Sequence, residues 1–361
     1  MNNFLLDWNI ATTQHRVISP RETEPLVNPS TSQTHTINIQ RTDLLYPGGI
    51  DACLAIIGLG STCNTPLYNR LIQRFGSEEQ MLTKLRIISD LEKSSDIRSK
   101  TAIFFDVRAE PAQNLYARIR EYVVMSQGDF HNDSVNSASI ITHWIEDNSG
   151  FRVNISPLIL RYAYAVIVNT LWFKDRWINE FDANRTKLLP FYTRTEIKTV
   201  FTMTQRDNID IYEHGNIVGV KLPFNQGAVA EFMMGLFEDD AFENTYTYQN
   251  ENIALYLPKF EHKAECDLSP RLSNTGYGDM FIDGNLDRLG KNKNISIRSI
   301  TQIIHVRFDE EGAEVKSATT MLAIIPGITT MPKYRTIEFN RPFHYRIVKD
   351  SITLVHGYYK G

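Results

Sequence analysis

The run YAYAVIVNTLWFKDRW, residues 162–177, restricts the fold of this chain more than any other feature. It is the longest strand-like stretch, and its apolar residues do not alternate with polar ones. A strand that is apolar on both faces needs cover on both sides, which is the situation of a central strand. The sequence therefore predicts a large sheet with further layers packed against each face.

Helices are predicted mainly before that strand. An all-round apolar run after Gly49 and up to Gly60 predicts a buried helix. Apolar residues at helical spacing predict a second helix after Thr65. Residues 134–149 predict an amphipathic helix that stops at Gly150. The predicted buried face of this helix carries Ile140, Ile141, Trp144 and Ile145.

Strands are predicted for most of the remainder. The strand-like segments are TAIFFDVRA in the first half and then TEIKTVFTM, NIVGVKLPF, AVAEFMMGLF, NIALYLPKFEH, IRSITQIIHVRFDE, YRTIEFNRPFHYRIVKD and SITLVHGYYKG. A helical first half followed by a strand-rich second half predicts a single α+β domain. Residues 16–43 are polar and aperiodic and are expected to form a loop or a partly ordered arm, so residues 1–43 are expected to be an N-terminal arm and the domain to span residues 44–361.

Composition and charge argue against several classes of function. The chain is 42% apolar and 22% charged, and its formal charge of -4 gives no reason to expect nucleic acid or an anionic membrane as a partner. No run approaches the roughly 18 apolar residues of a membrane span. The first residues lack the basic segment and apolar core of a signal peptide. We therefore expect a cytoplasmic protein, with secretion by another route as the alternative.

Motifs that carry enzymatic chemistry are not found. The sequence has no GxSxG, HExxH, Walker or GxGxxG motif. Cys53, Cys63 and Cys266 have neither disulfide nor metal-site spacing and are interpreted as buried or incidental thiols. The acidic residues 309–311 are interpreted as a solvated strand end, since neighbours on a strand point to opposite faces. No catalytic residue, metal or cofactor is expected, and the chain is not predicted to be an enzyme.

A long segment separates the last strands of the sequence. Residues 308–343 start like the end of one strand and finish like the start of another. Between them lie about 25 residues that fit neither helix nor strand, and an unstructured stretch of that length in a compact domain is usually functional or disordered.

Several stretches resemble the serpin family in order and spacing. They are LLYPGGIDACLAIIGLGSTCNT, VNTLWFKDRWINEF, KLPF, LYLPKF, DEEGAE and IEFNRPFHYRI. The resemblance covers roughly residues 44–361 and implies the serpin fold. In that α+β fold a helical N-terminal half packs on a large central mixed sheet, the C-terminal half is rich in strands, and a reactive-centre loop is exposed, here at about residues 310–336. The segment after residue 236 is shorter than is usual in serpins, and in this respect the chain resembles poxvirus-type members of the family.

The resemblance also implies a mechanism, which is suicide-substrate inhibition of a serine protease. The protease cuts the loop, and the loop then inserts into the main sheet as an extra strand with the acyl-enzyme attached. The implied hinge residues are Glu310, Glu311, Gly312, Ala313, Val315, Ser317 and Thr319. From Ala313 onward the uncharged alternate residues would face the interior, while Glu314 and Lys316 would face solvent.

The sheet-opening region is assigned by the same resemblance. It implies that Glu310 lies opposite Lys259 and near Trp177, at the end of the sheet where insertion begins. Asn169 belongs to a mid-sheet polar cluster that controls how readily the sheet opens.

Other positions depart from the family's pattern. Serpins keep serines where this chain has Tyr46 and Gly49, and usually a histidine where it has Gln302, so the polar cluster is expected to be reduced to Asn169. Val315 is bulkier than the alanine usual at its position and is expected to slow insertion. These departures favour the alternative function, a non-inhibitory binding protein or a protease substrate that has lost efficient loop insertion.

The bait is expected within residues 320–331. Counting forward from Glu310 by the usual spacing reaches Ile324 to Pro326, while counting back from Phe339 reaches Thr330 or Met331. The bait candidates are Leu322, Ala323, Ile324, Ile325, Thr330 and Met331. Because all of them are apolar or small, an elastase- or chymotrypsin-like serine protease is favoured as the partner of a monomeric inhibitor.

Overall fold

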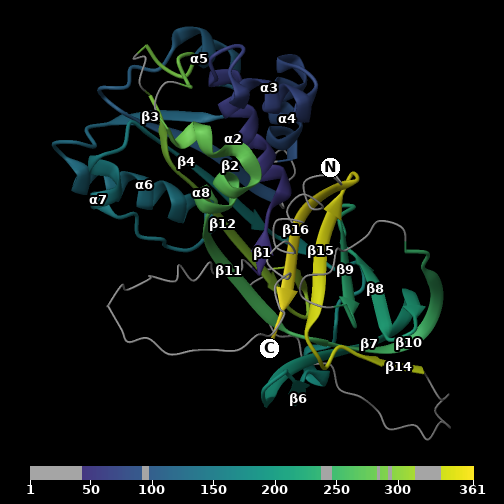
Figure 1. Cartoon of the computed structure of the whole chain (residues 1–361). Helices are drawn as coiled ribbons and strands as arrows, with labels where there is room; N and C mark the ends of the chain where they lie inside the picture. Colours follow the sequence, from purple (N-terminus) through teal and green to yellow (C-terminus); the bar gives the residue numbers. More distant parts are fainter. Residues whose placement is uncertain (1–42, 92–96, 237–245, 283–284, 292–294, 314–334) are drawn as a thin grey trace, which may run out of the picture.

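The structure is a computed structural model that describes residues 43–91, 97–236, 246–282, 285–291, 295–313 and 335–361. Two large sheets and a set of helices account for most of these residues (Figure 1). The predicted central strand is confirmed as β4 (Ala165–Phe173), the third of five strands in one sheet. Eight of its nine residues are buried, as a strand covered on both faces requires.

The five-stranded sheet contains both parallel and antiparallel pairs. Its strand order is β11 (Phe260–Asp267), β12 (Ile297–Phe308), β4, β2 (Ile97–Asp106) and β3 (Val124–Gly128). The pairs β12–β4 and β2–β3 are parallel, and the pairs β11–β12 and β2–β4 are antiparallel. In the β12–β4 pair, Gln302 lies directly opposite Asn169. The predicted mixed sheet is therefore present.

Helices cover the two faces of this sheet. Helix α2 (Pro47–Gly60) packs with a cluster that includes Ile103 and Ile167, whereas α6 (Ser134–Ser149) packs with Phe104 and Val166. Because successive side chains of a strand point to opposite faces, these two helices lie on opposite sides of the sheet. Figure 1 shows α6 and α7 on one side of strands β2 and β4, and α3 and α4 on the other side.

The start of α2 differs from the prediction. The helix begins at Pro47, ahead of the predicted start after Gly49. A proline suits the first helical position because its fixed φ is helical and its missing N–H would have no partner there. The second predicted helix is confirmed as α3 (Pro66–Phe75), and the Oγ1 of Thr65 caps it by accepting from the backbone N–H of Tyr68 at 3.2 Å.

The remaining helical elements are short or lie at the surface. They are α4 (Glu78–Asp90), α5 (Gln113–Ile119), α7 (Pro157–Arg161), α8 (Ser269–Leu272), η3 (Ala183–Arg185), η4 (Ser273–Tyr277) and η5 (Gly278–Phe281). Within the described ranges, no helix combines the length and the apolar character needed to cross a lipid bilayer.

The second large sheet is formed mainly by the second half of the chain. Its order is β1 (Leu44–Leu45), β16 (Ile352–Tyr359), β15 (Phe343–Lys349), β9 (Val229–Met234), β8 (Ile217–Pro223), β7 (Ile197–His214), β10 (Gln249–Pro258) and β14 (Arg335–Glu338), with β6 (Lys187–Tyr192) also paired to β7. The first and last described strands are neighbours, because β1 pairs with β16. The core is therefore closed by contacts between the two ends of the described chain.

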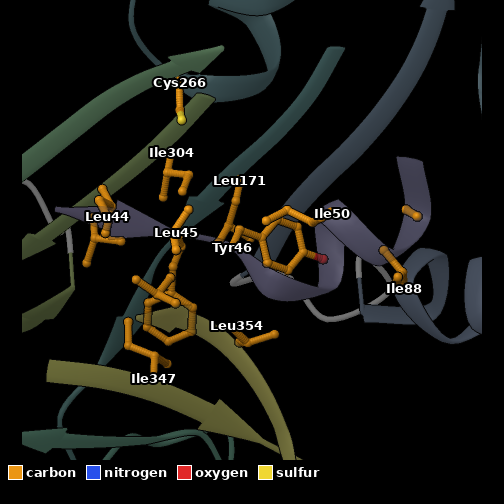
Figure 2. Packing of buried hydrophobic residues seen from close by; sticks show 14 of the residues in the cluster. Leu44, Leu45, Tyr46, Ile50, Ile88, Leu171, Cys266, Ile304, Ile347 and Leu354 are labelled. Atoms are coloured by element: carbon orange, nitrogen blue, oxygen red, sulfur yellow. The ribbon is translucent and has the colours of Figure 1, made fainter. Parts of the chain in front are cut away.

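The segment that leads into α2 lies between the two sheets. Figure 2 shows Leu45 with Ile304 on one side and Ile347 on the other. Ile304 belongs to the five-stranded sheet and Ile347 to the nine-stranded sheet, and all three side chains are in one buried cluster. This packing fixes the position of Tyr46, the next residue and the start of the polar network described below.

Two details of the strand and helix predictions were wrong. In α6, Ile141 and Ile145 are buried and Trp144 is half-buried, but Ile140 is 50% exposed because one helical step rotates it away from the sheet. The predicted strand at 252–262 is two strands, since the chain passes from β10 to β11, and so from one sheet to the other, at Lys259. The polar arm at 1–42 and most of the shortened segment, residues 237–245, lie outside the described residues.

Candidate functional site

The chain reverses direction directly after β12. Asp309 closes the turn: its backbone N–H donates to the carbonyl of Gly312 at 2.8 Å, and its carboxylate accepts from the backbone N–H of Glu311 at 3.1 Å. Asp309 and Glu310 are 4% and 8% exposed. The interpretation of residues 309–311 as a solvated strand end was wrong, because the turn folds back under neighbouring segments and buries two of the three acidic residues.

The residues after the turn form a short strand, β13 (Gly312–Ala313). It pairs antiparallel with β5 (Asp175–Arg176), which follows β4 in the chain. Gly312 has φ +149°, and a Cβ built on it would lie 2.1 Å from the carbonyl oxygen of Asp175. Only glycine fits this close approach, which agrees with its predicted place at the turning point.

Glu310 is held by two side chains and one backbone group. The Nζ of Lys259 lies 2.5 Å from its Oε2, and the Oγ1 of Thr186 donates to its Oε1 at 2.7 Å. The backbone N–H of Phe181 donates to its carbonyl at 2.8 Å. Burial alone would raise the pKa of Glu310, but the hydrogen bonds from Lys259 and Thr186 outweigh it, so the pKa lies below its ordinary value.

The ion pair expected between Glu310 and Lys259 is therefore present. Thr186 was missed by the sequence reasoning because it is one of several polar residues in the run NRTK at the start of β6, and no pattern connects it to the loop.

Trp177 lies beneath the same turn. Its ring stacks on Phe224 with centroids 4.2 Å apart, and its Nε1 donates to the carbonyl of Asp309 at 2.9 Å. Its backbone N–H donates to the carbonyl of Glu311 at 3.0 Å. The indole is 2% exposed and ties the turn to the apolar core, as an aromatic ring with a polar edge can do.

The mid-sheet polar cluster is larger than predicted. Gln302 accepts from the backbone N–H of Tyr46 at 3.0 Å and donates to the backbone carbonyl of Tyr46 at 2.8 Å. Its Nε2 also lies 3.3 Å from the Oδ1 of Asn169, whose Nδ2 donates to Thr101 at 2.9 Å. The hydroxyl of Tyr46 shares a hydrogen bond of 2.9 Å with Ser99. The expectation that only Asn169 remains was wrong, because other side chains supply the polar contacts.

Gly49 has a steric role in this cluster. A Cβ at this position would lie 1.9 Å from the Oδ1 of Asn169 and 2.6 Å from the Cδ1 of Tyr46. The space beside the helix is thus filled by the tyrosine ring and the asparagine side chain. Glycine at residue 49 leaves room for the Tyr46 ring and the Asn169 side chain, and a serine at that position would clash with both.

A protein-family model described as Serpin (serine protease inhibitor) matches residues 44–357 of this chain. The chain belongs to the serpin family.

Relatives of this serpin include insect and viral proteins. Antichymotrypsin-2 of Bombyx mori is 24% identical over 335 residues, which cover 84% of this chain and 88% of that protein. An uncharacterized serpin-like protein of Fowlpox virus is 26% identical over 256 residues, covering 64% of this chain and 70% of that protein. The crystal structure of Serpin48 from the insect Tenebrio molitor superposes with a TM-score of 0.74 at 20% identity, over 87% of this chain and 90% of that one. The predicted family and fold are confirmed.

The predicted hinge is only partly within the described residues. Glu310, Glu311, Gly312 and Ala313 are placed as above, and the next described residue is Arg335. The predicted hinge and bait residues that lie outside the described residues are Val315, Ser317, Thr319, Leu322, Ala323, Ile324, Ile325, Thr330 and Met331. Arg335 opens β14 and is held by Glu251 at 3.0 Å and by Glu213, so ion pairs hold described residues on both sides of the predicted bait.

The cysteines have no part in this site. Cys53 and Cys266 are buried and Cys63 is exposed, and none of these three described cysteines forms a disulfide. Burial raises the pKa of Cys53 to about 12, which keeps its thiol protonated and unreactive. Among the residues that the structure describes, no three His, Cys, Asp or Glu side chains are grouped as a metal site.

Proposed function

We propose that this serpin is a suicide-substrate inhibitor of an elastase- or chymotrypsin-like serine protease. The observation that carries the proposal is the pairing of β13. Gly312 and Ala313 turn back from β12 and already pair antiparallel with β5, the continuation of β4. Because β4 and β12 are parallel, a strand that runs back from the end of β12 is antiparallel to both. The start of the loop thus has the position and direction of a strand about to enter between them.

The alternation of residues after Ala313 also supports insertion of the loop between β4 and β12. Ala313 is fully buried, so Val315, Ser317 and Thr319 share its inward parity in any strand that continues from it. None of them is charged, which is the condition for burial beneath a covered sheet. Insertion would also have to separate Asn169 from Gln302, which lie opposite each other on β4 and β12.

The inhibitory reaction is a competition between two steps. The protease serine attacks the bait carbonyl, the peptide bond breaks, and the amine of the following residue leaves with a proton, which gives an ester between enzyme and loop. If the loop inserts before water hydrolyses the ester, the enzyme is carried away and trapped. If hydrolysis comes first, the serpin is released as a cut substrate.

The target class follows from the bait. Residues 320–331 contain Leu322, Ile324, Ile325 and Met331, and none of these twelve positions holds Lys or Arg. Apolar side chains fit the primary pockets of chymotrypsin- and elastase-like enzymes, whereas trypsin-like enzymes need a basic residue. A relative named Antichymotrypsin-2 is consistent with this choice. A cytoplasmic location and a monomeric state stay predictions from the sequence.

The test is incubation with elastase, chymotrypsin and trypsin in parallel. Denaturing gels should reveal a detergent-resistant complex with one of the first two enzymes, and mass spectrometry of the released C-terminal fragment should give its first residue between 321 and 332. Clean cleavage by every enzyme without a complex would contradict the proposal and favour a serpin that has lost inhibition.

A further inference from the structure

An apolar surface lies on the hairpin formed by β6 and β7. Leu188, Tyr192, Ile197 and Phe201 are 56%, 46%, 68% and 57% exposed. Single exposed apolar residues are ordinary, but several together on one face of a protein mark an interaction site.

The pairing of the two strands makes these residues neighbours. Leu188 lies opposite Phe201, Tyr192 lies opposite Ile197, and the exposed Pro190 occupies the row between them. Among the residues of opposite parity, Phe191 is fully buried and Leu189 and Val200 are partly buried, whereas Lys198 is exposed. The outer face therefore carries an apolar strip of Leu188, Pro190, Tyr192, Ile197 and Phe201, interrupted by Thr199 opposite Pro190.

The strip begins at the base of the reactive loop. Thr186, the hydrogen-bond donor to Glu310, stands two positions before Leu188. Lys259, the ion-pair partner of Glu310, donates its backbone N–H to the carbonyl of Phe201 at 2.7 Å. The surface is thus continuous with the anchor of the loop at its N-terminal end.

The other anchor of the loop belongs to the same sheet. β14, which begins at Arg335, pairs with β10; β10 pairs with β7, and β7 with β6. The described chain stops at Ala313, beside the β6 edge of this four-strand group, and resumes at Arg335 on its opposite edge. A protease that grips the predicted bait would therefore be held close to these strands.

We propose that the apolar strip is a secondary contact for the target protease, outside that enzyme's active-site cleft. This inference rests on the proposed function, which supplies the partner of the strip: a serine protease with apolar side chains around its active-site cleft. The strip would hold the enzyme on the serpin before the bait carbonyl is attacked. Strip contacts would slow dissociation of this first complex, which is where most affinity differences between related interfaces arise.

The test uses a protease that cannot perform the chemistry. We would take whichever of chymotrypsin, elastase and trypsin cuts the loop fastest and replace its catalytic serine by alanine. Its Kd would be measured for the unchanged serpin, for the double variant Ile197→Ser/Phe201→Ser, and for the control Leu158→Ser. Leu158 on α7 is 71% exposed, so the control removes a similar apolar side chain from another element.

The expected result is about a tenfold rise in Kd for the double variant and none for the control, as for loss of central apolar contacts in an interface. Equal Kd values for all three proteins would overturn the inference. Light scattering of each free serpin provides a further check, because a wild-type dimer that the double variant dissociates would make the strip a contact between two copies and would also overturn it.

The same samples separate this inference from the proposed function. With the active protease, cleavage without a trapped complex would end the proposed function, yet a Kd that depends on the strip would still support the secondary contact. A trapped complex together with unchanged Kd values would support the proposed inhibitory function and contradict the secondary contact at the strip.

Discussion

The side-chain amide of Gln302 hydrogen-bonds both the backbone N–H and the backbone carbonyl of Tyr46, a residue 256 positions earlier in the chain. Tyr46 precedes α2, and Gln302 lies on β12 opposite Asn169 of β4. One side chain thus joins the start of the buried helix to the two strands that loop insertion would separate. We expect this link to set part of the free energy needed to open the sheet.

Replacing Gln302 by Leu tests that expectation. The change would remove the hydrogen bond that Gln302 accepts from the buried backbone N–H of Tyr46, at a cost of roughly 1–3 kcal/mol, whereas the Tyr46 carbonyl would keep its hydrogen bond from the backbone N–H of Ile50 at 3.2 Å. We expect urea unfolding to give a lower free energy of unfolding by about 1–3 kcal/mol. The control Gln226→Leu changes a glutamine in the exposed turn between β8 and β9 and should alter stability little. Equal losses for the two variants would mean that the amide of Gln302 does not carry the link.

Gly312→Ala tests the close approach of the hinge to β5. Both the φ of +149° and the contact with the Asp175 carbonyl disfavour a Cβ, so we expect a loss of about 2–3 kcal/mol in the free energy of unfolding. Gly215→Ala is the matched control, because Gly215 has φ +61° but nothing within 4 Å of its Cβ position. It should lose only about 1 kcal/mol. Equal losses in the free energy of unfolding for the two variants would mean that the contact with Asp175 does not contribute to stability.

The Glu310–Lys259 pair predicts a dependence of stability on pH. The folded pKa of Glu310 lies below its ordinary value of 4.5, so the pair stabilises the fold above that pH and the contribution is lost as the pH falls through the folded pKa. Unfolding free energies of wild type and Glu310→Gln, measured between pH 7 and pH 3, should therefore differ most near neutrality and converge in acid.

An exposed pair serves as the control for this experiment. Glu110 also has a lowered pKa because of its hydrogen bond from Lys291, but both side chains are largely exposed. Solvent screening weakens such pairs, so Glu110→Gln should change the pH profile less than Glu310→Gln does. A difference in unfolding free energy between wild type and Glu310→Gln that stays constant from neutral to acid pH would contradict the assignment of the effect to the ionised carboxylate.

Loop parity predicts opposite effects of arginine at two nearby positions. Val315 shares the inward parity of Ala313, so Val315→Arg should stop insertion and turn the serpin into a substrate that is cut without trapping the enzyme. Ala318→Arg would place its charge on the solvent side and should preserve the complex. Gel densitometry of complex against cleaved serpin measures both. A variant Val315→Arg that still traps the protease would contradict the assumed register.

The main elements of the fold were open to prediction because their signals are local. The apolar run at 162–177 required a covered central strand, and Gly150, with φ +74°, ends α6 as predicted. The transfer of the chain between sheets at Lys259 has no local signal, since the segment reads as one strand.

The polar contacts of the site were predicted less well than its position. The pair of Glu310 and Lys259 followed from the family resemblance, whereas Gln302 was interpreted as a lost histidine. The link from Gln302 to Tyr46 depends on two substitutions far apart in sequence, and a hydrogen bond between distant residues leaves no periodic pattern. The burial of Asp309 and Glu310 was missed for a related reason, because the turn that buries them is set by Trp177 and β5.

The central claim is that the cut loop enters the sheet between β4 and β12, and thermal unfolding of the cut protein tests it most directly. A protease that cleaves within residues 320–331 would be removed after a single cut, and the melting temperatures of intact and cut serpin would be compared. A new central strand adds main-chain hydrogen bonds and buried side chains, so we predict that the cut form melts well above the intact one. An unchanged or lower melting temperature would mean that the loop stays outside the sheet.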